Sequence, residues 1–155
     1  MKKSNSLCTH VELYCDGACL GNPGPGGWGY ILRMPDLCGF AEKEVSGSEA
    51  VTTNNRMELR AVIEGLLGLS HPCNVLLYSD SQYVVKGIQC WLESWKSKGW
   101  LKADGGSVAN LDLWQALDIQ LKIHKVEAIW VRGHDGHLEN ERVDLLAREA
   151  AKSII

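Results

Sequence analysis

A stretch rich in glycine and proline limits how the first third of the chain can fold. From Tyr14 to Gly29 the sequence reads YCDGACLGNPGPGGWG. Glycine adopts backbone conformations that are closed to other residues, and proline is excluded from helix interiors. A helix is therefore ruled out here. Asp16 stands where an apolar strand pattern meets the glycines, and two interpretations are open: a metal or phosphate site, or a hairpin turn beside a solvated acid.

The rest of the chain alternates strand and helix patterns. The apolar spacing and turn residues predict strands over 9–15, 28–34, 38–46, 75–78 and 127–131, with a loop over 17–27, a turn at 35–36 and a loop over 132–139. They predict helices over 56–69, 81–88, 111–122 and 140–152.

This order of elements predicts an α/β fold. Three consecutive strands favour an antiparallel meander, whereas strands that alternate with helices favour parallel pairing. We expect a five-stranded mixed sheet, with three antiparallel and two parallel strands and helices on both faces. At 155 residues the chain is expected to form a single domain over 1–155, with 1–8 as a flexible N-terminus.

Composition excludes several classes of protein. A net charge of −3 argues against a protein that coats nucleic acid by bulk charge. None of the six cysteines falls in a CxxC pair, which argues against a zinc knuckle, and Cys15, Cys73 and Cys90 are expected to be buried. No secretory signal or membrane span is evident. We expect a cytoplasmic monomer that does not contact membranes.

Four acids stand at positions where they could meet. Asp16 and Asp80 each end a predicted strand, and they lie side by side if those strands are parallel neighbours. Glu58 and Asp144 lie at the borders of apolar helix faces. Four carboxylates repel one another unless a hard cation such as Mg²⁺ neutralises them. Taken singly, each acid is better explained as a helix cap, a helix-terminus charge or a solvated surface charge, and only their joint placement favours a metal site.

A glycine-flanked histidine precedes the last predicted helix. His134 lies in the segment RGHDGHLE, where a mobile imidazole beside a metal site could move protons or help to release product. His137 could pair with it on zinc, but zinc sites need three or four such ligands. We therefore favour proton transfer or product release over zinc binding.

Tryptophans and lysines are concentrated between residues 91 and 102. Trp91, Trp95 and Trp100 alternate with Lys96 and Lys98. Lysines suit phosphates and indoles suit sugars or bases, which favours contact with nucleic acid. A small amphipathic helix with a local tryptophan core explains the pattern equally well, because Trp91 and Trp95 share a helix face.

With these motifs in order, the chain resembles the type 1 ribonuclease H family, and its bacterial members most closely. The resemblance runs from about Val11 to Ala151. It rests on YCDGACLGNPGPGGWG, TTNNRMEL, YSDSQYV, the tryptophan–lysine segment and RGHDGHLENERVDLLA, in that order.

The resemblance implies hydrolysis of the RNA strand of an RNA–DNA hybrid, leaving 5′-phosphate and 3′-hydroxyl ends. It implies that Asp16, Glu58, Asp80 and Asp144 bind metal and act in catalysis, with His134 as the mobile histidine. The expected ions are two Mg²⁺ with substrate bound, with Mn²⁺ as the alternative. The implied minor-groove contacts are Cys19, Asn22, Asn54, Asn55 and Gln82. The implied contacts to the DNA strand are Thr53, Trp91, Trp95, Lys96, Lys98 and Trp100.

Three positions depart from the family pattern. Val51 replaces a common arginine, Ser94 a common asparagine and Ser97 a frequent lysine. The first two positions help to build the family's pocket for a DNA phosphate. We therefore expect a weaker grip on the DNA strand than in typical relatives.

Two alternative functions compete with this interpretation. One is another nuclease of the same fold, such as a junction resolvase or a transposase-like enzyme. The TTNN block and the tryptophan segment argue against it. The other is a non-catalytic module that binds hybrids, and four intact acids facing a phosphate backbone would not help a pure binder.

Overall fold

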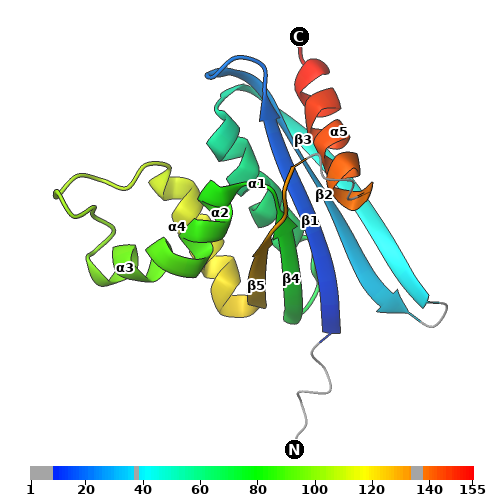
Figure 1. Ribbon diagram of the computed structural model, residues 1–155, viewed down its shortest axis with the longest axis horizontal. Helices are drawn as coiled ribbons and strands as arrows, with labels where there is room; N and C mark the ends of the chain where they lie inside the picture. Colours follow the sequence, from blue (N-terminus) through cyan, green and yellow to red (C-terminus); the bar gives the residue numbers. More distant parts are fainter. Residues whose placement is uncertain (1–8, 37–38, 134–137) are drawn as a thin grey trace, which may run out of the picture.

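A computed structural model describes residues 9–36, 39–133 and 138–155. Its centre is a five-stranded sheet in the order β3-β2-β1-β4-β5 (Figure 1). Antiparallel pairing joins β1 to β2 and β2 to β3, whereas β1–β4 and β4–β5 pair in parallel. The predicted mixed sheet is confirmed. The strands are β1 (Thr9–Cys19), β2 (Gly24–Asp36), β3 (Gly39–Thr52), β4 (Cys73–Ser79) and β5 (Lys125–Trp130).

Helices lie on both faces of the sheet, as predicted. One face packs against α1 (Asn54–Leu67), which in turn contacts α4 (Leu111–Ile123). The opposite face packs against α5 (Leu138–Lys152), which lies across β1, β2 and β3 (Figure 1). Beside the sheet, α2 (Gln82–Lys86), a π-helical turn η2 (Gly87–Trp91) and α3 (Leu92–Ser97) form an arm with the loop that follows them.

The glycine-rich stretch is mostly strand, so the predicted loop over 17–27 is wrong. β1 and β2 continue into it, and residues 20–23 connect them. The glycines permit close packing instead of a long loop. A side chain at Gly27 would collide with the backbone oxygen of Ala147 in α5, and a Cβ at Gly29 would lie 2.7 Å from the Cβ of Leu146.

Other boundaries differ from the predictions. The turn expected at 35–36 is the end of β2, the third strand extends to residue 52, and α5 begins at Leu138 instead of 140. The helix expected over 81–88 continues through a π turn, where Gly87 lies directly against the ring of Trp114. Cys15 and Cys73 are buried as expected, but Cys90, in that π turn, is exposed.

The core fills the space between the sheet and α1. Leu13 of β1 packs against Gly65 of α1, and Leu77, Leu59 and Trp114 are fully buried around them. Burial of such side chains contributes about 1.5–3 kcal/mol each. No helix in the described part of the chain is long and apolar enough to cross a membrane.

Candidate active site

Three carboxylates meet at one end of the parallel strands. The register of β1 and β4 pairs Tyr14 with Tyr78, so Asp16 in β1 and Asp80, directly after β4, follow two residues later on neighbouring segments. Oxygen atoms of Asp16, Glu58 and Asp80 all lie within 4.8 Å of one another. Asp16 and Glu58 are 3% and 7% exposed, and Asp80 is half-buried. The structure thus brings together three of the acids that the sequence singled out.

Gly17 explains how Glu58 reaches this position from α1. The Gly17 N–H donates to Glu58 Oε1 at 2.8 Å and to Asp16 Oδ1 at 2.9 Å. A side chain at Gly17 would collide with the backbone of Met57 and Glu58. The absence of a Cβ therefore lets the first turns of α1 cross β1 closely enough for one backbone donor to serve both acids.

Burial and mutual repulsion disfavour ionisation of these acids. Burial, followed by the charge of Asp80, raises the pKa of Asp16 to about 8, although its hydrogen bond with Glu58 works in the opposite direction. Burial raises the pKa of Glu58 well above its ordinary value, and the charges of Asp16 and Asp80 add to the shift. A cation at this position would relieve both effects.

Asp144 of α5 lies beside this cluster. Its proximity contributes to the raised pKa of Asp16, so the two carboxyls are neighbours. Its Oδ2 also accepts a hydrogen bond from Arg148 Nε at 3.0 Å. A Cβ at Gly133 would lie 3.0 Å from Asp80 Oδ2, so the chain passes close to the cluster there. His134 and His137 lie outside the described residues.

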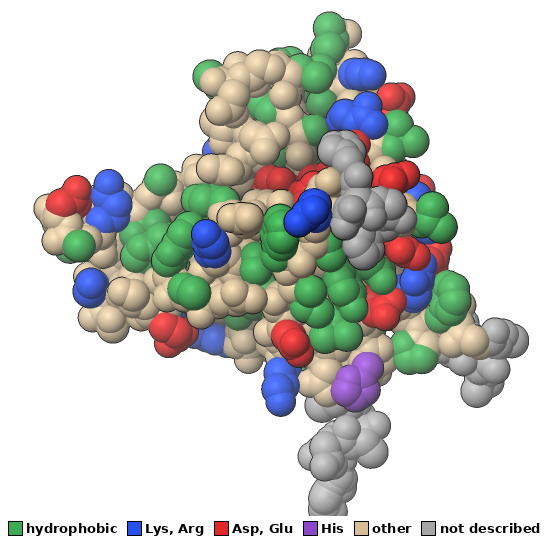
Figure 2. Space-filling view, in the orientation of Figure 1, with side chains coloured by type: hydrophobic (Ala, Val, Ile, Leu, Met, Phe, Trp, Pro, Cys, Tyr) green, Lys and Arg blue, Asp and Glu red, His purple; other side chains and the backbone are tan. Residues whose placement is uncertain are grey.

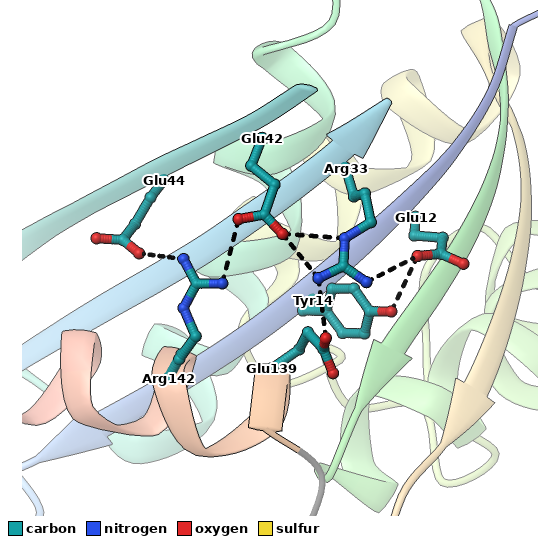
Figure 3. A network of polar contacts seen from close by, with 7 residues as sticks. All are labelled: Glu12, Tyr14, Arg33, Glu42, Glu44, Glu139 and Arg142. Atoms are coloured by element: carbon teal, nitrogen blue, oxygen red, sulfur yellow. Dashed lines mark hydrogen bonds and ion pairs between the residues drawn. The ribbon is translucent and has the colours of Figure 1, made fainter. Parts of the chain in front are cut away.

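A charge network that the sequence analysis missed holds the first turn of α5 to the sheet (Figure 3). Arg33 Nη2 on β2 donates to Glu139 Oε2 of α5 at 2.8 Å and to Glu42 Oε2 of β3 at 2.7 Å. Arg142 of α5 bonds the other oxygen of Glu42 at 3.2 Å. The signal in the sequence was a single arginine inside the otherwise apolar pattern of β2. The network fixes the start of the helix that carries Asp144.

Four of the five residues expected to contact the minor groove lie in the β1–β2 hairpin or the first turn of α1, whereas Gln82 begins α2. Asn22 Oδ1 accepts the backbone N–H of Asn54 at 2.8 Å, which ties the turn to the helix. The Cys19 thiol donates to Gly21 O at 2.8 Å. Thr53 caps α1 by accepting the Arg56 N–H. Asn54, Asn55 and Gln82 are exposed.

The tryptophans of the arm form a local aromatic cluster. The ring centroids of Trp91 and Trp95 are 5.8 Å apart, and Trp95 packs edge-on against the buried Trp114 at 5.3 Å. Trp100 is half-buried and Lys98 is exposed. This packing agrees with the local-core interpretation, and Trp91, Trp95 and Trp100 each remain partly exposed.

Lys96, expected to contact DNA, is held by acids of the protein itself. Its Nζ lies 3.0 Å from Asp118 Oδ1 and 3.3 Å from Glu93 Oε2. Asp118 is 6% exposed and also pairs with Lys122 at 3.4 Å. Part of the positive charge of Lys96 is therefore neutralised before any nucleic acid binds.

A hollow of about 520 Å³ lies on the same face of the sheet as α5, over the part of that face that the helix does not cover. It is away from the carboxylates. Glu12, Arg33, Phe40 and Leu76 help to line it, and hydrophobic side chains are visible on this face in Figure 2. None of the four acids lines this hollow, so we assign the chemistry to the carboxylate cluster.

Comparison with known proteins identifies the family. The family model described as RNase H matches residues 8–152. The chain belongs to the ribonuclease H family. A ribonuclease H from Novosphingobium aromaticivorans is 58% identical over 142 residues, covering 92% of this chain and 96% of that protein. A ribonuclease H from Erythrobacter litoralis is 59% identical over 142 residues, covering 91% and 95%.

Solved structures of ribonucleases H share the fold. LC9-RNase H1, a type 1 RNase H with the type 2 active-site motif, matches with a TM-score of 0.85 and 38% identity, covering 94% of this chain and 74% of that one. LC11-RNase H1 in complex with an RNA/DNA hybrid matches with a TM-score of 0.65 over 93% and 98% of the two chains. At 22% identity, the second likeness concerns the fold alone.

Proposed function

We propose that this ribonuclease H hydrolyses the RNA strand of RNA–DNA hybrids as an endonuclease, leaving 5′-phosphate and 3′-hydroxyl ends. The observation that carries the proposal is the group of three carboxylates within 4.8 Å, in a chain of the ribonuclease H family. Like charges this close and this buried are costly unless the site serves to bind positive charge.

The donor set fits a hard divalent cation. It consists of carboxylate oxygens, and neither Asp16 nor Glu58 is paired with a lysine or arginine in the described ranges. Asp16, Glu58, Asp80 and Asp144 would hold Mg²⁺, as two ions with substrate bound, with Mn²⁺ as the alternative. When bound, such ions activate water and relieve charge on the leaving oxygen of a phosphodiester.

The chain's own residues position the substrate and move protons. In this proposal the neutral groups of Cys19, Asn22, Asn54, Asn55 and Gln82 contact the RNA-side minor groove, where 2′-hydroxyls distinguish RNA from DNA. Trp91, Trp95 and Trp100, with Thr53, Lys96 and Lys98, hold the DNA strand. His134 transfers protons beside the carboxylates. Further parts of the proposal are that the protein is cytoplasmic and acts as a monomer.

One assay tests the proposal against its competitors. The protein is incubated with Mg²⁺ and, separately, with an RNA–DNA hybrid, duplex RNA and duplex DNA. We expect cleavage of the RNA strand of the hybrid alone, and loss of cleavage when the metal is chelated. Cleavage of duplex DNA would indicate another nuclease of this fold, and binding without cleavage would indicate a hybrid-binding module.

A further inference from the structure

The two groups of proposed substrate contacts lie on different elements. Asn54 and Asn55 are in the first turn of α1, whereas Trp91 and Trp95 are on η2 and α3 of the arm. In the proposed function, on which this inference rests, the first group contacts the minor groove and the second holds the DNA strand. The distance between the two groups then decides which duplexes fit.

Tyr83 connects the arm to α4 through both its ring and its hydroxyl. The hydroxyl accepts hydrogen bonds from Trp114 Nε1 at 2.9 Å and from Asn110 Nδ2 at 3.0 Å. The ring packs edge-on against Trp91 at 6.0 Å and against Trp114 at 5.4 Å. Tyr83 therefore touches the aromatic cluster on one side and the start of α4 on the other.

Asn110 continues this connection to α1. Its Oδ1 accepts from Arg56 Nη1 at 3.4 Å, while its Nδ2 donates to Tyr83. Arg56, directly after Asn55, also forms two hydrogen bonds with Asp112 at 2.9 and 2.7 Å. Asn110 adopts a left-handed backbone with φ of 59°, which directs the chain into α4. Both ends of its amide are thus in use.

We propose that the hydrogen-bonded chain Arg56–Asn110–Tyr83 sets the spacing between the α1 contacts and the tryptophan arm, and thereby selects RNA–DNA hybrids over other duplexes. These three are positioning residues, since they act through their neighbours. Minor-groove width differs between A-form and B-form duplexes. Two contact surfaces held at a fixed spacing fit one width well and others poorly.

Breaking the hydrogen bonds between Arg56, Asn110 and Tyr83 has two expected effects. Affinity for the hybrid falls, because the arm must then be ordered on binding. Affinity for duplex RNA and duplex DNA does not fall in parallel, because a mobile arm can adjust to either width. The selectivity ratio, the Kd of each competing duplex divided by that of the hybrid, therefore decreases.

Two conservative variants break the chain at different atoms. Tyr83→Phe removes the hydroxyl and keeps the ring contacts. Asn110→Gly removes both hydrogen bonds of the Asn110 side-chain amide, and glycine suits the left-handed backbone at this position. Tyr78→Phe is the matched control, since Tyr78 stacks on Tyr14 on the α5 side of the sheet. All three are made in the Asp16→Asn background, and binding of labelled hybrid, duplex RNA and duplex DNA is measured by fluorescence anisotropy.

We expect both selectivity ratios to fall about five-fold in Tyr83→Phe and in Asn110→Gly, the scale of one hydrogen bond. The control should keep the wild-type ratios. The selectivity ratios of the double variant, Tyr83→Phe with Asn110→Gly, should fall no further than those of Asn110→Gly alone. Both substitutions interrupt the same series of hydrogen bonds. A purely structural role would lower the fraction of active protein and leave the ratios unchanged.

The inference is overturned if either variant keeps a ratio within three-fold of its background, or if Tyr78→Phe shows the same fall. Cleavage by the wild-type protein is measured separately. A wild type that binds hybrid selectively without cutting it removes the proposed function and leaves the binding test intact.

Discussion

The carboxylate of Asp16 combines deep burial with the proximity of three other acids. In the absence of metal this arrangement disfavours the folded state, because like charges are held together away from water. We expect Asp16→Asn to reduce hybrid cleavage by at least about a hundred-fold, since losing even an outer-shell partner of a metal ligand costs about 10- to 100-fold, and to leave hybrid binding largely intact. It should also raise the unfolding free energy without metal by about 1–3 kcal/mol.

Asp118→Asn is the matched control for this prediction. Asp118 is almost as buried, but it pairs with Lys96 and Lys122. Its neutralisation should therefore lower stability in the same urea titration and spare cleavage. Equal stability changes for the two substitutions would contradict the assignment of Asp16 to an unpaired acidic cluster.

His124 gives stability a pH dependence of its own. It is 4% exposed, and its Nδ1 accepts the Cys73 N–H at 3.1 Å. Burial lowers its pKa, with a smaller contribution from the charge of His71, against a hydrogen bond with Leu66 that raises it. Its stabilising contribution is therefore complete above the unfolded-state value of about 6.5 and is lost as the pH falls through the folded-state pKa.

We expect the urea midpoint of the wild-type protein to shift downward relative to that of His124→Gln as the pH is lowered from 7.5 to 5. His10→Ala serves as the control, since this histidine is exposed on β1. The quantity compared is the difference in urea midpoint between variant and wild type at each pH. The acids titrate alike in both proteins, so their contribution cancels. Parallel pH profiles for His124→Gln and wild type would remove His124 as the cause.

At the scale of elements, the glycines of β2 determine how near α5 comes to the sheet. The packing of Gly29 against Leu146 lets the helix bring Asp144 beside Asp16. Gly29→Ala should displace α5, lower stability by about 1–3 kcal/mol as overpacking does, and reduce cleavage more than hybrid binding. Thermal unfolding and steady-state kinetics measure both effects.

Gly106→Ala is the appropriate comparison for this change. Gly106 lies in the loop after α3, where a new Cβ would lie 3.2 Å from Asp104 Oδ1. This substitution should alter stability and cleavage little. A normal cleavage rate in a folded Gly29→Ala protein would show that the approach of α5 does not control the site.

Element types were predictable because apolar periodicity reflects which face is buried. The helices with one apolar stripe, such as α4 with Leu113 and Leu117, matched closely. The β1–β2 hairpin did not, since glycine signals both a turn and a close contact, and only the position of α5 distinguishes them. The π turn could not be predicted either. Its Gly87 packs directly against the ring of Trp114, which is distant in sequence.

At the scale of the whole molecule, part of the positive charge proposed to hold the DNA strand is neutralised or missing. Figure 2 shows lysines and arginines scattered among acidic and hydrophobic side chains on the face in view. Val51 is 77% exposed and Ser94 is exposed, so neither position is used by the core. Lys96 is partly neutralised by Asp118. These features support the expectation of a weak grip on DNA.

We expect Val51→Arg combined with Ser94→Asn to tighten hybrid binding and to steepen its dependence on salt. One added arginine at a phosphate increases the slope of log K against log salt by about 0.7–0.9. Leu67→Arg, at the opposite end of α1 and 56% exposed, adds the same charge away from the site. An equal slope change in both proteins would attribute the effect to net charge alone.

The acids of the candidate site were predictable from the sequence, but the contacts that hold them in place were not. Two acids at the ends of parallel strands and two on apolar helix borders are local signals that a sheet topology can combine. The supports of the site are not local: Gly17 bonding Glu58, Arg33 bonding Glu139 and Asn110 joining Arg56 to Tyr83. Each of these contacts joins residues at least 27 positions apart, where spacing along the chain carries no information.

The four acids come from β1, α1, the residue that follows β4, and α5, in the order of the chain. During synthesis, a chain that has not yet added α5 has Asp16, Glu58 and Asp80 but lacks Asp144 and Glu139, the partner of Arg33 on that helix. In the proposed function such a chain is inert. The proposed activity therefore requires that α5 has been synthesised and packed against the sheet.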